Sequence, residues 1–221
     1  MKYKKAIVTS GPTIEWIDPV RFISNASSGK MGHAIADELV SHVDELVYIH
    51  GNICPEYKNV KDAKSIFAET TEDMRDRVLE SLAPDTILIM AAAPLDYKPA
   101  NPYGSKLKKE KDTLSMDFLK NPDILLAVRE HVEKNSVANV MRIGFAAETN
   151  DLEKYAMDKL DRKGLKFIIG NSVYKNKSGF GNIDSSVTIF SAQGIEKNIS
   201  GSKEDIAAGL IQFLTSVANE T

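Results

Sequence analysis

The chain has 221 residues, of which 43% are hydrophobic and 27% charged, a balance typical of a globular protein large enough to bury a core. Its formal net charge of -3 gives no basic field for a polyanion, so we expect neither a nucleic acid nor a membrane surface as a partner. Cys54 is the only cysteine, which excludes an internal disulfide and cysteine-based metal sites and favours a cytoplasmic protein.

Short apolar runs alternate with longer amphipathic runs, the pattern of parallel strands joined by crossover helices. The first apolar run is too short for a signal sequence or a membrane span. In the first half of the chain we expect a strand over 4–11, a helix over 29–42, strands over 45–51 and 65–70, a helix over 71–83 and a central strand over 85–92. Met31, Ile35 and Leu39, with Ala34, would form the buried face of the first helix, and Thr70 or Thr71 would cap the second.

Residues 93–120 interrupt this alternation, because they are rich first in proline and then in lysine. This composition predicts an excursion from the sheet with hairpin arms, a flexible flap over about residues 98–118. Beyond it we expect a helix over 121–134, a strand over 141–149, a helix over 150–164, a strand over 165–172, a hairpin over 185–200 and a final helix over 202–220. The interpretation is a single α/β domain over residues 1–221, a three-layer Rossmann-like or ribokinase-like sheet with crossover helices.

The stretch RFISNASSGKMG, residues 21–32, places small residues just before the first helix, where backbone N–H groups could approach an anion. It matches neither common phosphate loop. A Walker loop would need a glycine at Ser24 and a hydroxyl at Met31, and a dinucleotide loop would need a third glycine besides Gly29 and Gly32. Two interpretations stay open: an anion site at a helix N-terminus, or an ordinary serine-capped helix whose glycines pack against the sheet.

The lysines of SKLKKEK lie in the expected flap. If this segment is a strand, Lys106 and Lys108 share one face and Lys109 and Lys111 share the other, so only one pair could face a ligand. A lysine carried in on a loop could neutralise charge that develops on a phosphoryl group. The alternative is a solvated, charged hairpin that protects a sheet edge.

Other polar residues follow predicted strands, and in open α/β sheets ligands gather at the carboxyl ends of strands. Asp96 and Asp123 could bind ribose hydroxyls or Mg²⁺, although Asp123 could instead only cap its helix. Lys159 and Lys163, four residues apart on one helix, could both reach a triphosphate or could simply be solvated. The four histidines show no metal-ligand spacing and no GxSxG motif is present, so zinc sites and hydrolase triads are not expected.

Taken together and in this order, several segments resemble the phosphopantothenoylcysteine synthetase family, also called phosphopantothenate–cysteine ligases: SGPTIEWIDPVRFISNASSGKMG, LDYKP, KLKK, NPDIL, GFAAET, and KLDRKG followed by IIGN. The likeness runs from about Ala6 to the final helix, and DPVRFISNASSGKMG is its most specific block. Many members also carry a decarboxylase half, which this sequence does not show, so the resemblance is to the stand-alone form.

The resemblance implies a two-step ligation in coenzyme A biosynthesis. A nucleoside triphosphate, usually CTP in bacterial members and otherwise ATP, would activate the carboxylate of 4′-phosphopantothenate as an acyl-nucleotide, an acyl-cytidylate with CTP, and the amine of cysteine would then displace the nucleotide. Mg²⁺ is expected on physical grounds, because a triphosphate at a site with few fixed positive groups needs a metal to screen its oxygens. The resemblance also implies a homodimer, with a separate decarboxylase acting next in the pathway. Residues 91–97 read AAAPLDY where the family commonly has AAVADY or a similar sequence, which leaves the choice of nucleotide open.

The resemblance also assigns roles to residues. Asn25 matches the asparagine that holds the acyl intermediate, and Lys106 matches the flap lysine that assists reaction at the α-phosphate, so these two are the expected catalytic residues. Nucleotide contacts are expected from Met90, Ala91, Ala92, Asp96, Lys106, Pro122, Asp123, Ile124, Leu125, Phe145, Lys159 and Lys163. Substrate phosphate contacts are expected from Arg21, Asn25, Ser27, Ser28, Gly29 and Lys30.

Two other functions remain as alternatives. A non-catalytic nucleotide sensor on the same fold would need the anion-binding loops but not Asn25 and Lys106 together. A nicotinamide-dependent reductase is disfavoured because the GxGxxG fingerprint is missing. Binding without turnover would identify the sensor, and a tightly bound nicotinamide would identify the reductase.

Overall fold

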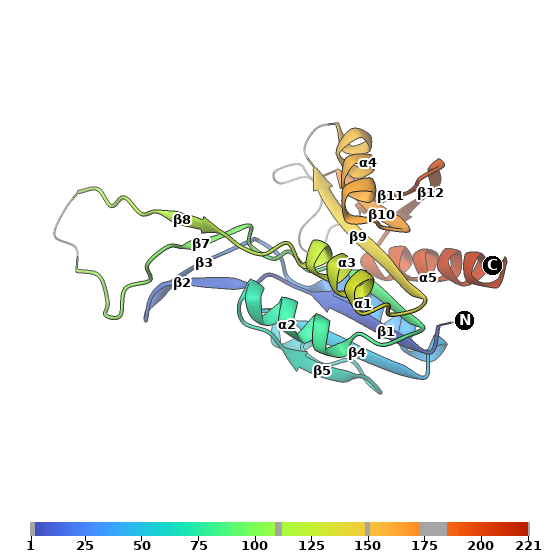
Figure 1. The fold of residues 1–221 in the computed structure, drawn as a ribbon, viewed down its shortest axis with the longest axis horizontal. Helices are drawn as coiled ribbons and strands as arrows, with labels where there is room; N and C mark the ends of the chain where they lie inside the picture. Colours follow the sequence, from blue (N-terminus) through green and yellow to red (C-terminus); the bar gives the residue numbers. More distant parts are fainter. Residues whose placement is uncertain (1–2, 109–111, 149–150, 173–184, 221) are drawn as a thin grey trace.

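The computed structural model describes residues 3–108, 112–148, 151–172 and 185–220. Its centre is an eight-stranded sheet in the order β12-β11-β10-β9-β6-β1-β4-β5 (Figure 1). These strands are β1 (Lys5–Ser10), β4 (Glu45–His50), β5 (Lys64–Phe67), β6 (Thr86–Met90), β9 (Val140–Glu148), β10 (Phe167–Ser172), β11 (Ser185–Ser191) and β12 (Gly194–Gly201). The strands from β10 to β5 are parallel, whereas β11 and β12 join as an antiparallel hairpin, so the sheet is mixed.

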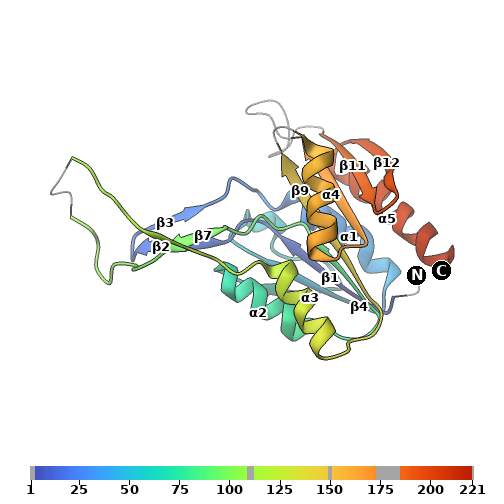
Figure 2. The same cartoon turned by 45° about the horizontal axis from the view of Figure 1, so that its top comes forward.

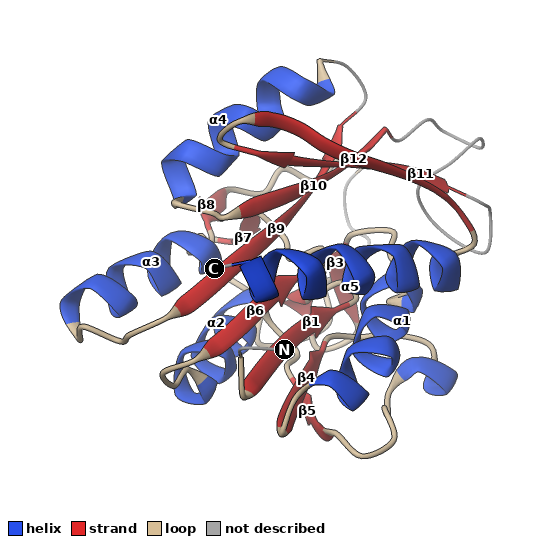
Figure 3. Ribbon diagram, turned by 90° about the vertical axis from the view of Figure 1, so that its right-hand side faces the viewer, coloured by secondary structure: helices blue, strands red, loops and turns tan. Residues whose placement is uncertain are grey.

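Helices cover both faces of this sheet, which confirms the expected three-layer α/β architecture. The helix α1 (Lys30–Leu39) packs beside α5 (Lys203–Glu220) on one face. The other face carries α2 (Thr71–Ser81), α3 (Ile124–Lys134) and α4 (Leu152–Lys163). Figure 3 shows the α1 and α5 pair on the opposite side of the strands from α3. Short 3-10 turns lie at Val40–His42 and Pro55–Tyr57.

The apolar pattern explains why these segments form these elements. All five residues of β6 are buried, as a central strand covered on both faces requires. In α1 the predicted face is confirmed for Ala34, Ile35 and Leu39, while Met31 is only partly buried. Thr70 rather than Thr71 caps α2, in a reciprocal capping box with Asp73. Among the described residues, no helix is both long and apolar enough to span a membrane.

Two helix starts differ from the expected ones. Asp123 is the N-cap of α3, so the Asn-Pro pair at residues 121–122 lies before the helix rather than in its first turn. The side chain of Asp123 accepts from the backbone N–H of Leu126 at 3.3 Å, as the capping alternative predicts. The helix α4 begins at Leu152, and the expected start at residue 150 lies outside the described residues.

An arm built from two short antiparallel pairs projects from the carboxyl-end side of the sheet (Figures 1 and 2). In this arm β2 (Ile14–Asp18) pairs with β3 (Arg21–Ser24), and β7 (Tyr97–Pro99) pairs with β8 (Phe118–Lys120). The two pairs are linked by contacts between β2 and β7. The expected flap corresponds to the segment between β7 and β8, and its described residues, including Lys106 and Lys108, have no regular strand structure. The hairpin of β2 and β3 was not expected from the sequence.

Candidate functional site

A cavity of about 310 Å³ lies at the carboxyl ends of β6, β9 and β10, beside the first residues of α1 and α5. The chain passes from β1 outward to β4 and β5, then returns to β6 on the other side of β1. This reversal of strand order is where ligands bind in open α/β sheets. The volume suits a small-molecule ligand.

The cavity brings together residues from four parts of the chain that are far apart in sequence. Nine of the residues expected at the site line it: Ser27, Ser28, Gly29, Lys30, Ala91, Ala92, Asp96, Phe145 and Lys159. They come from the block before α1, from the segment after β6, and from β9 and α4. The arrangement therefore joins the small-residue block to the strand ends in one pocket.

The start of α1 bears on the second of the two interpretations of the small-residue block. Gly29 is the N-cap, in the left-handed conformation with φ 84°, and no side chain caps the helix. No serine occupies the N-cap position, although Ser28 Oγ accepts from the backbone N–H of Lys30 at 3.3 Å. The glycines do pack against the sheet, and the anion site stays a prediction. A Cβ on Gly32 would lie 2.6 Å from Ser10 Cβ and 2.8 Å from the carbonyl oxygen of Thr9. The helix N-terminus is thus held close against β1 and borders the cavity, where its positive dipole end favours an anion.

Asn25 does not line the cavity but fixes one of its walls. Its Nδ2 donates to the carbonyl oxygens of Ala93 and Pro94, each at 3.1 Å, and these two residues do line the cavity. The neighbouring Ser24 Oγ donates to the carbonyl oxygen of Thr13 at 2.9 Å. The amide of Asn25 therefore connects the block before α1 to the segment after β6. Its expected catalytic role stays a prediction.

Lys106 is exposed and does not line the cavity, but its neighbour Leu107 is anchored to the arm. Asp18 Oδ2 accepts from the backbone N–H of Leu107 at 3.1 Å, and the Arg21 guanidinium donates to the carbonyl oxygen of Leu107 at 3.1 Å. Arg21 also pairs with Asp18, with Nη2 to Oδ2 at 2.5 Å. This pair, here called the Leu107 anchor, holds the flap segment against the β2 and β3 hairpin.

The chemistry of the Leu107 anchor is strongly polar. The side chain of Asp18 is fully buried. The pKa of this carboxyl is held well below its usual range, mainly by its hydrogen bond with the side chain of Arg21. Hydrogen bonds from the backbone N–H groups of Leu107, Val20 and Arg21 lower this pKa further. Arg21 is thus occupied by Asp18 and does not line the cavity. Its expected phosphate contact stays a prediction. Lys109 and Lys111 lie outside the described residues.

The segment at the start of α3 lies outside the cavity lining. Ile124 and Leu125 are buried in the core beneath α3, so their side chains face the sheet. Asp123 Oδ2 forms an ion pair with Lys163 Nζ at 2.9 Å, which occupies both of these expected nucleotide-binding side chains. Pro122 also lies off the lining, and Met90 is a buried core residue whose Sδ accepts from Thr9 Oγ1. A nucleotide contact from these positions would have to come from the backbone or after a rearrangement.

Asp96 is the acidic side chain among the described residues that line the cavity, and it is the candidate ligand for a divalent cation. Within the described part of the chain, no cluster of three or more histidine, cysteine, aspartate or glutamate side chains could hold a metal ion. Mg²⁺ in nucleotide sites is typically held by one or two carboxylates together with the phosphates of the substrate. The donor set at this cavity fits that arrangement.

Half of the cavity lining was not among the individual residues expected at the site: Met31, Gly32, Ala93, Pro94, Ala146, Ala147, Asn171, Val187 and Lys203. The first six adjoin residues that were expected, so their positions follow once the motifs are extended by a few residues. Asn171, Val187 and Lys203 come from β10, β11 and α5, and no local signal marks them. Their place at the cavity depends on tertiary packing.

The chain is similar to known proteins over almost its whole length. The family model described as DNA/pantothenate metabolism flavoprotein C-terminal domain matches residues 1–217. The coenzyme A biosynthesis bifunctional protein CoaBC of Bacillus subtilis (strain 168) is 34% identical over 219 residues, which are 99% of this chain and 52% of that protein. The chain spans about half the length of the curated relatives it matches.

Solved structures share the fold. The crystal structure of the C-terminal domain of coenzyme A biosynthesis bifunctional protein CoaBC has a TM-score of 0.74 and 27% identity, and the match covers 99% of this chain and 97% of that chain. A mutant of Cab2 in complex with phosphopantothenate-cysteine has a TM-score of 0.63 and 18% identity, with 99% of this chain and 89% of that chain covered. The second likeness concerns the fold alone.

Proposed function

Because the chain belongs to the DNA/pantothenate metabolism flavoprotein C-terminal domain family, we propose that it is a ligase that joins 4′-phosphopantothenate to cysteine in coenzyme A biosynthesis. The observation that carries the proposal is the cavity, in which the N-terminus of α1 and the side chain of Asp96 lie beside the same strand ends. A separate decarboxylase would use the product. The single cysteine favours the cytoplasm as the compartment.

The proposed chemistry has two displacements. First, a carboxylate oxygen of phosphopantothenate attacks the α-phosphorus of CTP or ATP, the bond from this phosphorus to the bridging oxygen breaks, and pyrophosphate leaves. Second, the amine of cysteine attacks the acyl carbon, the bond from this carbon to the phosphate oxygen breaks, and the amine loses a proton as the nucleoside monophosphate leaves. Both steps build negative charge on oxygen, which N–H donors and ammonium groups can stabilise.

The residues of the site divide this work. The backbone of residues 29–32 and the first turn of α1 would bind a phosphate group, and Lys106 would act at the α-phosphate. Asn25 would orient the acyl group from its place beside Ala93 and Pro94. Mg²⁺, held by Asp96 and the triphosphate, would screen the phosphate charge.

We expect the chain to release pyrophosphate and form the amide only when a nucleoside triphosphate, phosphopantothenate, cysteine and Mg²⁺ are all present. Removal of Mg²⁺ with a chelator should lower the rate by roughly 100-fold or more, because the triphosphate then meets the site unscreened. The measurement is pyrophosphate detection together with the product mass, with CTP and ATP compared side by side. Binding of nucleotide without any pyrophosphate release would contradict the ligase and favour the sensor.

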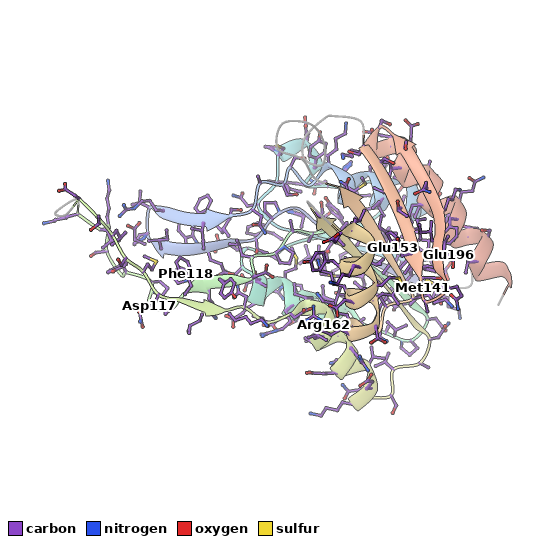
Figure 4. All side chains as sticks on the ribbon, turned by 90° about the horizontal axis from the view of Figure 1, so that it is seen from above. Asp117, Phe118, Met141, Glu153, Arg162 and Glu196 are labelled. Carbon is purple, nitrogen blue, oxygen red and sulfur yellow. The ribbon has the colours of Figure 1, made fainter. Side chains whose placement is uncertain are left out.

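We also propose that the chain is a homodimer that associates through the arm. Seven large apolar side chains are exposed on it: Val20, Phe22, Tyr97, Tyr103, Leu114, Phe118 and Leu119. Figure 4 shows Phe118 far out along the arm, away from the body of the molecule. Exposed apolar groups gathered on one projecting element are typical of a protein interface.

Light scattering at micromolar protein should therefore give about twice the chain mass of 24.3 kDa. A Phe118→Asp, Leu119→Asp variant should shift the mass to that of a monomer, because it places charges in the apolar interface. The control is Ile195→Asp on β12, which changes a residue with 56% exposure away from the arm and should leave the dimer intact. A monomeric wild-type chain would refute the proposed dimer.

A further inference from the structure

A buried lysine lines the candidate cavity and belongs to none of the sequence motifs. Lys203, the first residue of α5, is only 4% exposed. Its Nζ donates to Ser185 Oγ of β11 at 2.5 Å. Lysine is rarely buried to this extent, since removal of an ammonium group from water is costly. A buried ammonium at the wall of a ligand cavity is therefore a candidate binding group.

The surroundings of Lys203 suit an anion. The helices α1 and α5 pack side by side, and both begin at the cavity. Lys30, the first residue of α1, also lines the cavity, and its Nζ pairs with Glu204 Oε1 at 3.1 Å. The backbone N–H of Asp205 donates to Ser202 Oγ at 3.1 Å, which caps α5 and fixes the position of Lys203. The buried Lys203 and two helix N-termini thus border one end of the cavity, where the ammonium of Lys30 is paired with Glu204.

A second observation points to a ligand at the same wall. Asn171 of β10 lines the cavity, and its Oδ1 is buried without a hydrogen-bond partner among the described residues. Asn171 of β10 pairs with Val187 of β11, and Val187 lies two residues after Ser185 in the same strand. A buried acceptor without a partner is costly, and a hydroxyl or N–H group of a ligand, next to its phosphate, would remove this cost.

We infer that Lys203 binds a phosphate group of a substrate, and the inference rests on the proposed function. This phosphate belongs either to the triphosphate of the nucleotide or to the 4′-phosphate of phosphopantothenate. Because Lys203 is fixed between β11 and α5, its charge is in place before the substrate arrives, and little ordering is required on binding. Its role is that of a binding residue, distinct from Lys106 on the flap.

The test uses Lys203→Met, which keeps the aliphatic length and removes the charge. Binding of CTP, CMP, inorganic pyrophosphate, phosphopantothenate and pantothenate is measured by calorimetry, so no turnover is needed. We expect the variant to weaken one class of phosphate ligand by roughly 10- to 100-fold, as loss of one partner of a charged hydrogen bond does. Lys203→Arg should retain most of the affinity. The control Lys134→Met, at an exposed position in the last turn of α3, should bind like the wild type.

The outcomes separate the two phosphate sources. Selective loss of CTP and pyrophosphate binding would assign Lys203 to the triphosphate, and selective loss of phosphopantothenate binding would assign it to the 4′-phosphate. Unchanged affinity for all phosphate probes would overturn the inference, even if the wild type is an active ligase. An inactive wild type with weakened pyrophosphate binding in Lys203→Met would refute the ligase and keep the inference. If Lys203→Met does not fold, Lys203→Gln, which can still donate to Ser185, serves in its place.

Discussion

A Lys106→Gln variant should release pyrophosphate roughly 100- to 1,000-fold more slowly than the wild type, and no acyl-nucleotide should form. Glutamine keeps a polar side chain of similar reach but removes the positive charge that would act on the α-phosphate. A factor of this size corresponds to about 3–4 kcal/mol of lost transition-state stabilisation. The measurement is pyrophosphate release with saturating substrates and Mg²⁺, followed by mass spectrometry of quenched mixtures.

Lys108→Gln is the matched control for this prediction. Both lysines are exposed and flank Leu107, but the proposal gives the reaction at phosphorus to Lys106 alone. Neither substitution touches the Leu107 anchor, so the melting temperature should change little for both variants. An equal loss of rate in the two variants would indicate that the total positive charge of the flap, rather than Lys106 alone, supports the reaction. Wild-type rates in Lys106→Gln would remove Lys106 from the reaction.

An Asn25→Asp variant should instead form the acyl-nucleotide and then accumulate it. A carboxylate beside the oxyanion that develops during amine attack reverses a favourable interaction, and loss of one such donor costs roughly two orders of magnitude in rate. Pyrophosphate release in the first turnover should persist, while amide formation should slow. Mass spectrometry of quenched mixtures distinguishes the intermediate from the product. Accumulation in the Lys106 variant and none in the Asn25 variant would mean that the two roles are exchanged.

The structure adds a control for Asn25, because its Nδ2 also holds the carbonyl oxygens of Ala93 and Pro94. A change at this residue could act through the cavity wall rather than through the acyl group. Ser24→Ala removes the adjacent bond from Ser24 Oγ to Thr13 and loosens the same segment without a new charge. If Ser24→Ala accumulates the intermediate to the same extent, the effect of Asn25→Asp is structural.

The regular part of the fold could be predicted from the sequence because its signal is local. The apolar run over residues 87–90 of β6 and the buried face of α1 each indicate their element within a dozen residues. The hairpin of β2 and β3 gives no such signal. The hairpin is held by the edge-on contact of Trp16 with Phe22, whose ring centroids are 5.3 Å apart, and by the buried Asp18. Both interactions can form only after the chain has reversed direction between β2 and β3.

The same distinction applies to the candidate site. The small residues before α1 and the alanines after β6 could be placed at the cavity, since each motif adjoins a predicted strand or helix end. The side-chain directions at the start of α3 could not be predicted, because Ile124 and Leu125 are needed in the core. Lys203 and Asn171 carry no motif, and they reach the cavity only because α5 packs beside α1 and β10 pairs with β9.

The Leu107 anchor sets the reach of the flap lysine. Consecutive Cα atoms are about 3.8 Å apart and an extended lysine side chain adds roughly 6 Å, so Nζ of Lys106 can sweep only a sphere of about 10 Å radius around the Cα of Leu107. While Asp18 and Arg21 hold Leu107, the centre of that sphere moves with the β2 and β3 hairpin. If Lys106 acts at the α-phosphate as proposed, a phosphate farther than this from Leu107 could be reached only if the β2 and β3 hairpin moves with the anchor or the anchor opens.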